Sequence, residues 1–177
     1  LEECGAHVDT AIPHHIKDGY GLNESLIEEA REDGVGLIIT CDNGIAAIPA
    51  IRRAKELGMT VVVTDHHEVP YEEAEDGSVH TVLPPADAIV NPKQEDCTYP
   101  FKGICGAMVA FKVIWGLYES LGIPTDEMKK LIPFAAIATV GDVMDLTDEN
   151  RIIVKEGLLR LQNPENIGLK ALIRVNN

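Results

Sequence analysis

The chain has 177 residues, a length that is typical of one domain and too short for an elaborate multidomain enzyme. Hydrophobic residues make up 45% and charged residues 25% of it, so it can bury a core and need not be disordered. The 15 Lys and Arg against 29 Asp and Glu give a net charge of −14, which argues against a free-standing cationic nucleic-acid wrapper, because phosphate neutralisation needs clustered Lys and Arg. This charge does not exclude a nuclease site in which metal ions, rather than side chains, face the phosphate.

The cysteines and the apolar runs favour a reduced, cytoplasmic chain without a membrane span. No C-x-x-C pair occurs, so neither a disulfide framework nor a zinc site is expected. No apolar run approaches the roughly 20 residues that a membrane helix needs. Residues 1–5, with no initiating Met and no signal-peptide pattern, are typical of the last turn of a helix that Gly5 ends, so we expect the chain to begin within a fold.

The first half of the chain predicts a unit of strand, helix and strand. Asn23 is a good helix N-cap, and Gly34 and Gly58 are typical of positions just beyond a helix end. Pro49 is tolerated only in the first turn of a helix. Because a strand, a helix and a second, β-branched strand follow one another within residues 37–64, the two strands should be parallel. The expected strands span 7–12, 37–40 and 60–64, and the expected helices span 23–34 and 46–57.

The second half of the chain is predicted to be mainly helical. Residues 68–87 are acidic, rich in Pro and Gly and without a period, which indicates a surface excursion, and a third strand is expected at 88–91, before Pro92. The expected helices span 103–121, 126–139, 151–162 and 166–175. The sequence therefore predicts an α/β fold, with a parallel sheet followed by a mainly helical second half.

Two of the predicted strands end next to residues that can bind a metal ion. Asp42 follows the strand at 37–40, and His66 follows the strand at 60–64. Ligands bind at the carboxyl ends of parallel strands, and neighbouring strands lie ~4.8 Å apart, so both side chains can reach one ion. A carboxylate with an imidazole suits Mn²⁺, Mg²⁺ or a similar divalent ion. The alternative is an ordinary Asp-Asn-Gly turn and a solvated His, but two such groups at successive strand ends favour the metal site.

A third acid, Asp142, follows the apolar helix expected at 126–139. Its Ile, Val and Met neighbours predict partial burial, and a buried acid needs a partner. A metal ion is one such partner and a helix cap is another, and the residues themselves leave both open.

Several segments resemble the DHH phosphoesterase superfamily. Residues 63–67, Val-Thr-Asp-His-His, are similar to its signature, and residues 12–22 and 39–45 resemble the RecJ branch, the single-strand-specific 5′→3′ exonucleases. Segments similar to that branch continue, in its order, at residues 88–92, 103–111 and 140–142. The resemblance covers essentially the whole chain, and the joint pattern is specific although no single motif is.

The resemblance implies a two-metal phosphodiesterase. It implies that Asp42 bridges two divalent ions, Mn²⁺ by preference or Mg²⁺, and that His66 and Asp142 complete the coordination of one of them. Asp65 then orients the ligands, and His67 lines the site near the scissile phosphate. Two metal ions together activate a water and stabilise the leaving oxygen without a covalent intermediate.

Three further residues are linked to phosphate by the same resemblance. Gly103 and Gly106 are expected to open the helix beyond Cys105, where free backbone N–H groups suit an anion, or simply to permit a tight loop. His15 stands where the branch commonly has an Arg that helps to hold nucleic-acid phosphate. A His is charged only near or below its reference pKa of ~6.5, so phosphate binding there is weaker or belongs to another residue.

The resemblance also implies parts that residues 1–177 do not hold. RecJ-like proteins carry an Asp-x-Asp element on a first strand, expected just upstream of this sequence, and those acids complete the metal pair. The C-terminal DHH-associated domain and the basic nucleic-acid-binding domain are also absent, which fits the acidic balance. The expectation is one DHH domain, truncated at its N-terminus, that holds at most a partial metal site and is inactive or a poor nuclease alone.

The predicted function of the intact protein is metal-dependent 5′→3′ hydrolysis of single-stranded DNA in repair and recombination. Rivals within the superfamily are the oligoribonucleases with phosphoadenosine-phosphate phosphatase activity and the manganese pyrophosphatases, but residues 16–22 and 42–44 favour the RecJ branch. A non-catalytic DHH scaffold of a replication complex is a rival of another class. Such scaffolds tend to lose metal ligands. This sequence keeps the four candidate site residues, Asp42, His66, His67 and Asp142, which argues against that rival.

Overall fold

The computed structural model describes residues 1–13 and 21–176, which form two compact units, Leu1–Thr98 and Tyr99–Asn177. Each unit has its own hydrophobic core. In the described residues, no helix is long and apolar enough to cross a membrane.

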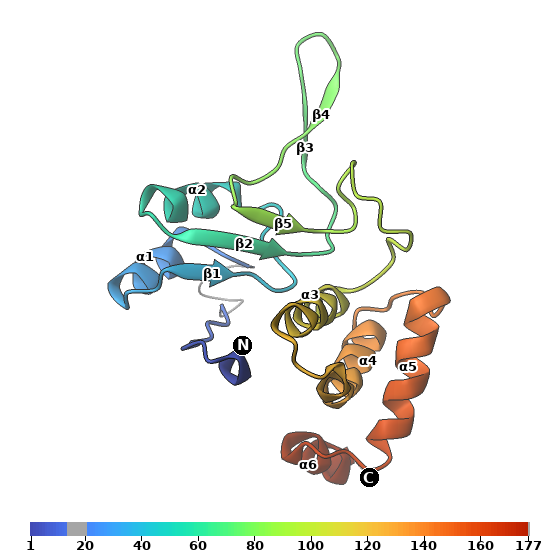
Figure 1. The fold of residues 1–177 in the computed structure, drawn as a ribbon. Coiled ribbons are helices and arrows are strands. Elements are labelled where there is room, and N and C mark those ends of the chain that lie inside the picture. The colour runs from blue at the N-terminus through green and yellow to red at the C-terminus, as the bar shows by residue number, and fades with distance from the viewer. Residues whose placement is uncertain (14–20, 177) are drawn as a thin grey trace. The chain divides into compact units, whose positions relative to one another are not determined.

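The first unit contains a three-stranded parallel sheet (Figure 1). Its strands are β1 (Leu37–Ile39), β2 (Thr60–Thr64) and β5 (Ala88–Val90), in the order β1-β2-β5. Ile38 lies opposite Val61, and Val63 lies opposite Ile89. The predicted α/β class with a parallel sheet is therefore confirmed, and the carboxyl ends of all three strands meet at one edge.

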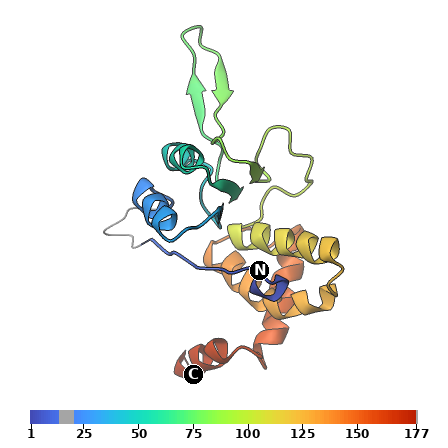
Figure 2. The ribbon, with the colours of Figure 1, turned by 60° about the vertical axis from the view of Figure 1, so that its left-hand side comes forward.

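Two helices, α1 (Glu24–Glu32) and α2 (Ile48–Glu56), cover one face of this sheet, and Figure 2 shows them on the same side. The side chain of Asn23 accepts a hydrogen bond from the Leu26 N–H at 3.0 Å, so α1 begins at the predicted cap. The buried side chains between helices and sheet are mostly Ile, Val and Ala: Ile27, Ala50, Ile51, Ala54, Met59, Val61 and Val63. This core fixes both strands that lead into the predicted site.

One strand predicted for the first unit is not formed. Residues 7–12 form no strand, because none of the described strands pairs with them. The surface excursion predicted at 68–87 is an antiparallel hairpin of β3 (Tyr71–Glu73) and β4 (Val79–Thr81), which stands clear of the sheet in Figure 2; its two strands were not predicted. Every side chain of these two strands is exposed, so the apolar alternation that normally marks a strand is missing. The predicted helical start is a short 3₁₀ turn, Glu2–Cys4, which Gly5 ends.

The second unit is helical, as predicted. It consists of α3 (Gly106–Leu121), the 3₁₀ helix η2 (Thr125–Leu131), α4 (Ile132–Gly141), α5 (Asp148–Leu161) and α6 (Ile167–Asn176). The single helix expected at 126–139 is divided at residue 132, because Pro133 lacks an N–H and fits only the first turn of α4. Helices α4 and α5 pack closely where Gly157 lies against Ala136.

Candidate metal centre

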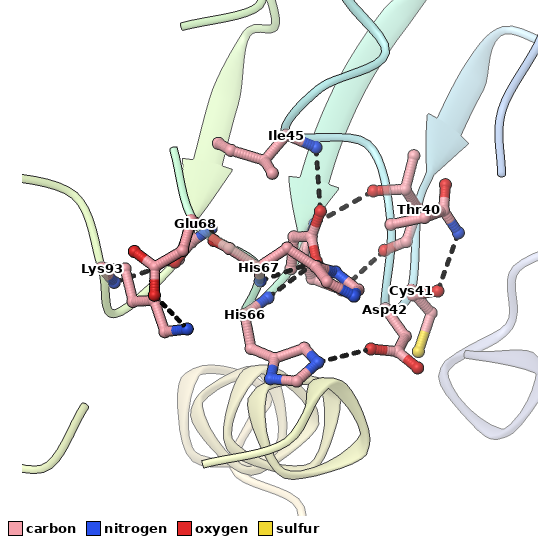
Figure 3. A network of polar contacts seen from close by, with 12 residues as sticks. Thr40, Cys41, Asp42, Ile45, His66, His67, Glu68 and Lys93 are labelled. Atoms are coloured by element: carbon pink, nitrogen blue, oxygen red, sulfur yellow. Dashed lines mark hydrogen bonds and ion pairs between the residues drawn. The ribbon is translucent and has the colours of Figure 1, made fainter. Parts of the chain in front are cut away.

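Asp42 and His66 lie side by side at the carboxyl ends of β1 and β2 (Figure 3). The His66 Nε2 atom is 3.0 Å from Asp42 Oδ1. The His66 side chain is only 9% exposed, whereas that of Asp42 is 55% exposed. The pair therefore lies at the protein surface, with His66 on its inner side. The predicted meeting of these two side chains is therefore confirmed by the geometry, and it follows from the parallel pairing of their strands.

Threonine hydroxyls lock the two strand ends together just before this pair. The buried Thr64 hydroxyl donates to the Thr40 carbonyl at 2.6 Å, and the Thr64 N–H donates to Thr40 Oγ1 at 3.2 Å. The ladder continues past β1, because the Asp42 N–H donates to the Thr64 carbonyl at 3.0 Å. Asp42 itself has a positive φ of 63°, a conformation that Asp adopts more readily than most residues and that turns the chain away from the sheet.

Asp65 is buried beneath the site, with a side chain only 1% exposed, and organises both neighbouring loops. Its Oδ2 accepts a hydrogen bond from the Ile45 N–H at 2.9 Å, and its Oδ1 accepts one from the His66 N–H at 2.8 Å. Burial acts to raise the pKa of the Asp65 carboxyl, but these donors, led by the Ile45 N–H, together with the His67 ring hold the pKa below its ordinary value. Asp65 is therefore ionised, and its carboxylate acts only as a hydrogen-bond acceptor.

This carboxylate orients the ring of His67. The His67 Nδ1 atom lies 2.7 Å from Asp65 Oδ1, and a carboxylate has no proton to donate, so Nδ1 carries the proton. The remaining nitrogen, Nε2, is then the acceptor of this ring, which is 59% exposed. The orienting role predicted for Asp65 has this geometric support, and its consequence for a bound metal stays a prediction.

Asp42, His66 and His67 form one group whose ligand atoms all lie within 4.8 Å of one another. Neighbouring ligands of an octahedral ion at about 2.0–2.1 Å are separated by about 2.9–3.0 Å, which is the separation of Asp42 Oδ1 and His66 Nε2. Carboxylate oxygen with imidazole nitrogen also suits Mn²⁺ and related divalent ions. The donor set therefore fits such an ion, and the structure adds His67 to the donors that the sequence grouped with Asp42.

Asp142, Gly103 and Gly106 belong to the second unit. Asp142 follows α4 in the second unit and is exposed, so its predicted partial burial is wrong: α4 ends there and Val143 continues outward with a positive φ of 55°. Its N–H donates to the Ala138 carbonyl, and its role as a metal ligand stays a prediction.

The residues predicted to contact phosphate are only partly described. Gly106 is the first residue of α3, as expected, but Gly103 precedes the helix, and its carbonyl accepts a hydrogen bond from Asn150 Nδ2 at 2.7 Å. A phosphate role for either glycine stays a prediction. His15 lies outside the described residues, as does most of the motif at 16–22.

One polar residue at this edge was not predicted as part of the site. Asn91 follows β5 directly, and its Nδ2 donates to the His67 carbonyl at 2.9 Å. The sequence identified it only as the end of a strand. The available signal was its position, because a polar side chain after the third parallel strand reaches the same edge as Asp42 and His66.

Comparison with known families agrees with this geometry. The family model described as "DHH family, N-terminal domain" matches residues 1–140. The chain belongs to the DHH family. It is 46% identical over 99% of its length to the single-stranded-DNA-specific exonuclease RecJ of Bacillus subtilis, and 34% identical over 97% to that of Escherichia coli. It spans 20% and 30% of the lengths of these two relatives.

Solved structures of this family have the same fold. The chain matches the crystal structure of an exonuclease RecJ bound to manganese with a TM-score of 0.80, at 33% identity over 98% of this chain and 41% of that one. A RecJ from Thermus thermophilus in complex with Mn²⁺ matches with a TM-score of 0.66, at 33% identity over 84% of this chain and 21% of that one. The predicted resemblance to the RecJ branch of the DHH family is confirmed.

Proposed function

We propose that the chain is the DHH domain of a nuclease that hydrolyses single-stranded DNA with Mn²⁺, from the 5′ end. The observation that carries this proposal is the convergence of Asp42, His66 and His67 at the carboxyl edge of the sheet, with ligand atoms within 4.8 Å. The relatives named above are single-stranded-DNA-specific exonucleases, and two of the matching structures are RecJ proteins with manganese. We place this activity in DNA repair and recombination in the cytoplasm.

The residues of the chain have separate tasks in this proposal. Asp42 and His66 hold the metal, and Asp142 remains a predicted further ligand. The buried Asp65 carboxylate keeps the His67 ring in one tautomer, which leaves Nε2 as the nitrogen that would bind an ion or phosphate oxygen. When bound, two divalent ions supply an activated water and stabilise the leaving oxygen of an in-line displacement.

The relatives named above are longer than this chain, which spans 20% and 30% of their lengths. In the described residues there is one group of three metal donors, which suffices for a single ion, whereas the two-metal reaction needs ligands for a second ion. A net charge of −14 repels polyphosphate, so capture of the DNA strand belongs to other parts of the protein. Residues 1–177 alone are therefore a poor nuclease.

The metal site is tested by isothermal titration of Mn²⁺ into the chain and its Asp42→Asn variant. Asp33→Asn is the matched control, because it removes the same charge from an exposed residue at the end of α1. The expected result is a strong loss of affinity for Asp42→Asn alone. Equal heats from both variants contradict the site.

The activity is tested with single-stranded DNA labelled at either end, comparing residues 1–177 with the longer protein under Mn²⁺. The longer protein should release label from the 5′ end, and residues 1–177 should be at least an order of magnitude slower. Comparable turnover by both contradicts the division of tasks.

A further inference from the structure

The third strand of the sheet also ends in a polar side chain that reaches the metal centre. Asn91, directly after β5, is buried with only 2% of its surface exposed. Its Nδ2 donates to the His67 carbonyl at 2.9 Å, and its Oδ1 accepts a hydrogen bond from the Lys93 N–H at 2.8 Å. Both the donor and the acceptor of the Asn91 amide are therefore bonded, and the donor binds the main chain of His67, a residue of the metal-binding group.

The hydrogen bond from Asn91 matters because the ring of His67 is exposed. Packing does not fix a side chain that is 59% exposed. Its orientation depends on the contact of Nδ1 with Asp65 and on the place of its own main chain, whose N–H donates to Asp65 and whose carbonyl accepts from Asn91. Without the amide, the His67 carbonyl loses a buried partner and only the N–H of its main chain stays bound, so the ring is held less firmly on Asp65.

A second tie in the same turn is weaker. Lys93 Nζ lies 2.7 Å from Glu68 Oε1, but the Glu68 side chain is 83% exposed, and pairs so open to solvent contribute little. Gln94 Nε2 donates to the carbonyls of Ile89 and Asn91 and so stabilises the turn itself, without contacting the histidines. The main chain of His67 is therefore held at its N–H by Asp65, at 3.2 Å, and at its carbonyl by Asn91.

We propose that Asn91 is a positioning residue of the metal centre: its buried amide holds the main chain of His67 so that the ring stays on Asp65 and presents Nε2 to the ion. This inference rests on the proposed function. All three parallel strands then contribute to the site: Asp42 after β1 and His66 after β2 bind the metal, and Asn91 after β5 positions His67.

The test compares Asn91→Ala with Gln94→Ala, a truncation in the same turn that leaves the His67 contact intact. Mn²⁺ affinity is measured calorimetrically at pH 8. Residues that orient metal ligands typically change metal affinity by about 10–100-fold, so Asn91→Ala should weaken binding by about that factor, whereas Gln94→Ala should stay within about 3-fold of the parent chain. Equal affinities of the two variants overturn the proposal.

A second readout needs no metal. Long-range ¹H–¹⁵N spectra of the imidazole rings should show His67 as the Nδ1–H tautomer in the parent chain and in Gln94→Ala. Asn91→Asp keeps the shape and the acceptor for Lys93 but loses the donor to His67, and should show averaged tautomers. This variant keeps the measurement decisive if Asn91→Ala fails to fold. An unchanged His67 signature in Asn91→Asp overturns the proposal even if Mn²⁺ binds, whereas failure of the parent chain to bind Mn²⁺ counts against the proposed function alone.

Discussion

Substituting Gly44 with Ala should damage the fold and the metal centre together. Gly44 lies two residues after Asp42 with a φ of 112°, and a Cβ placed there would be 2.7 Å from Thr40 Oγ1. Thr40 has little room to yield, because it is buried and its Oγ1 accepts the Thr64 N–H. Backbone strain costs about 1–3 kcal/mol, and the overpacking against Thr40 costs about 1–3 kcal/mol more.

Gly58→Ala separates these two contributions. Gly58 also has a positive φ, of 79°, but a Cβ there meets nothing within 4 Å, so the control carries backbone strain without the clash. Amide hydrogen exchange in β2 reports the opening free energy of the first unit. Gly44→Ala should lower that free energy by about 1–3 kcal/mol more than Gly58→Ala, and should weaken Mn²⁺ binding. Equal losses of stability in the two variants refute the reasoning.

Three further changes test other parts of the structure. Gly157→Ala should lower the stability of the second unit by about 1–3 kcal/mol in urea denaturation, because its Cβ would overlap that of Ala136; an unchanged midpoint contradicts this packing. Burial acts to raise the pKa of Glu149, but hydrogen bonds, first that from Lys112, lower the pKa below its ordinary value. The ionised Glu149 therefore stabilises the fold at pH values above its ordinary pKa, and this stabilisation is lost as the pH falls through the lowered pKa. The stability difference between the parent chain and Glu149→Gln should therefore shrink on acidification from pH 7, and a difference that is constant down to pH 3 argues otherwise. Asp65→Asn should weaken Mn²⁺ binding by about 10–100-fold in calorimetry, whereas unchanged affinity removes Asp65 from its orienting role.

The sequence predicts the sheet well because its signals are local. Asn23 caps a helix, glycines end helices, and the β-branched run at 60–64 suits only a buried strand. Once β1 and β2 are parallel neighbours, the meeting of Asp42 and His66 follows from geometry alone. That part of the site is predictable from the residues without any relative.

What the sequence misses depends on contacts between distant segments or on weak local signals. The strand expected at 7–12 has apolar residues but no described neighbour to pair with, and β3 and β4 pair although their side chains are all exposed. The division of the helix at Pro133 is an exception, because its signal is local and strong: proline in a helix interior costs about 3 kcal/mol. The bond from Asn91 to His67 was not predictable, because 24 residues separate them and only the parallel pairing of β2 with β5 joins them.

The most direct measurement of the metal centre is anomalous diffraction at the manganese absorption edge, from crystals of the chain grown with Mn²⁺. A bound ion should give a peak within coordination distance of both Asp42 Oδ1 and His66 Nε2, on the side of the His67 ring that Nε2 faces. A manganese peak elsewhere in the chain, or no peak at saturating Mn²⁺, would contradict the assignment of these residues as the metal centre.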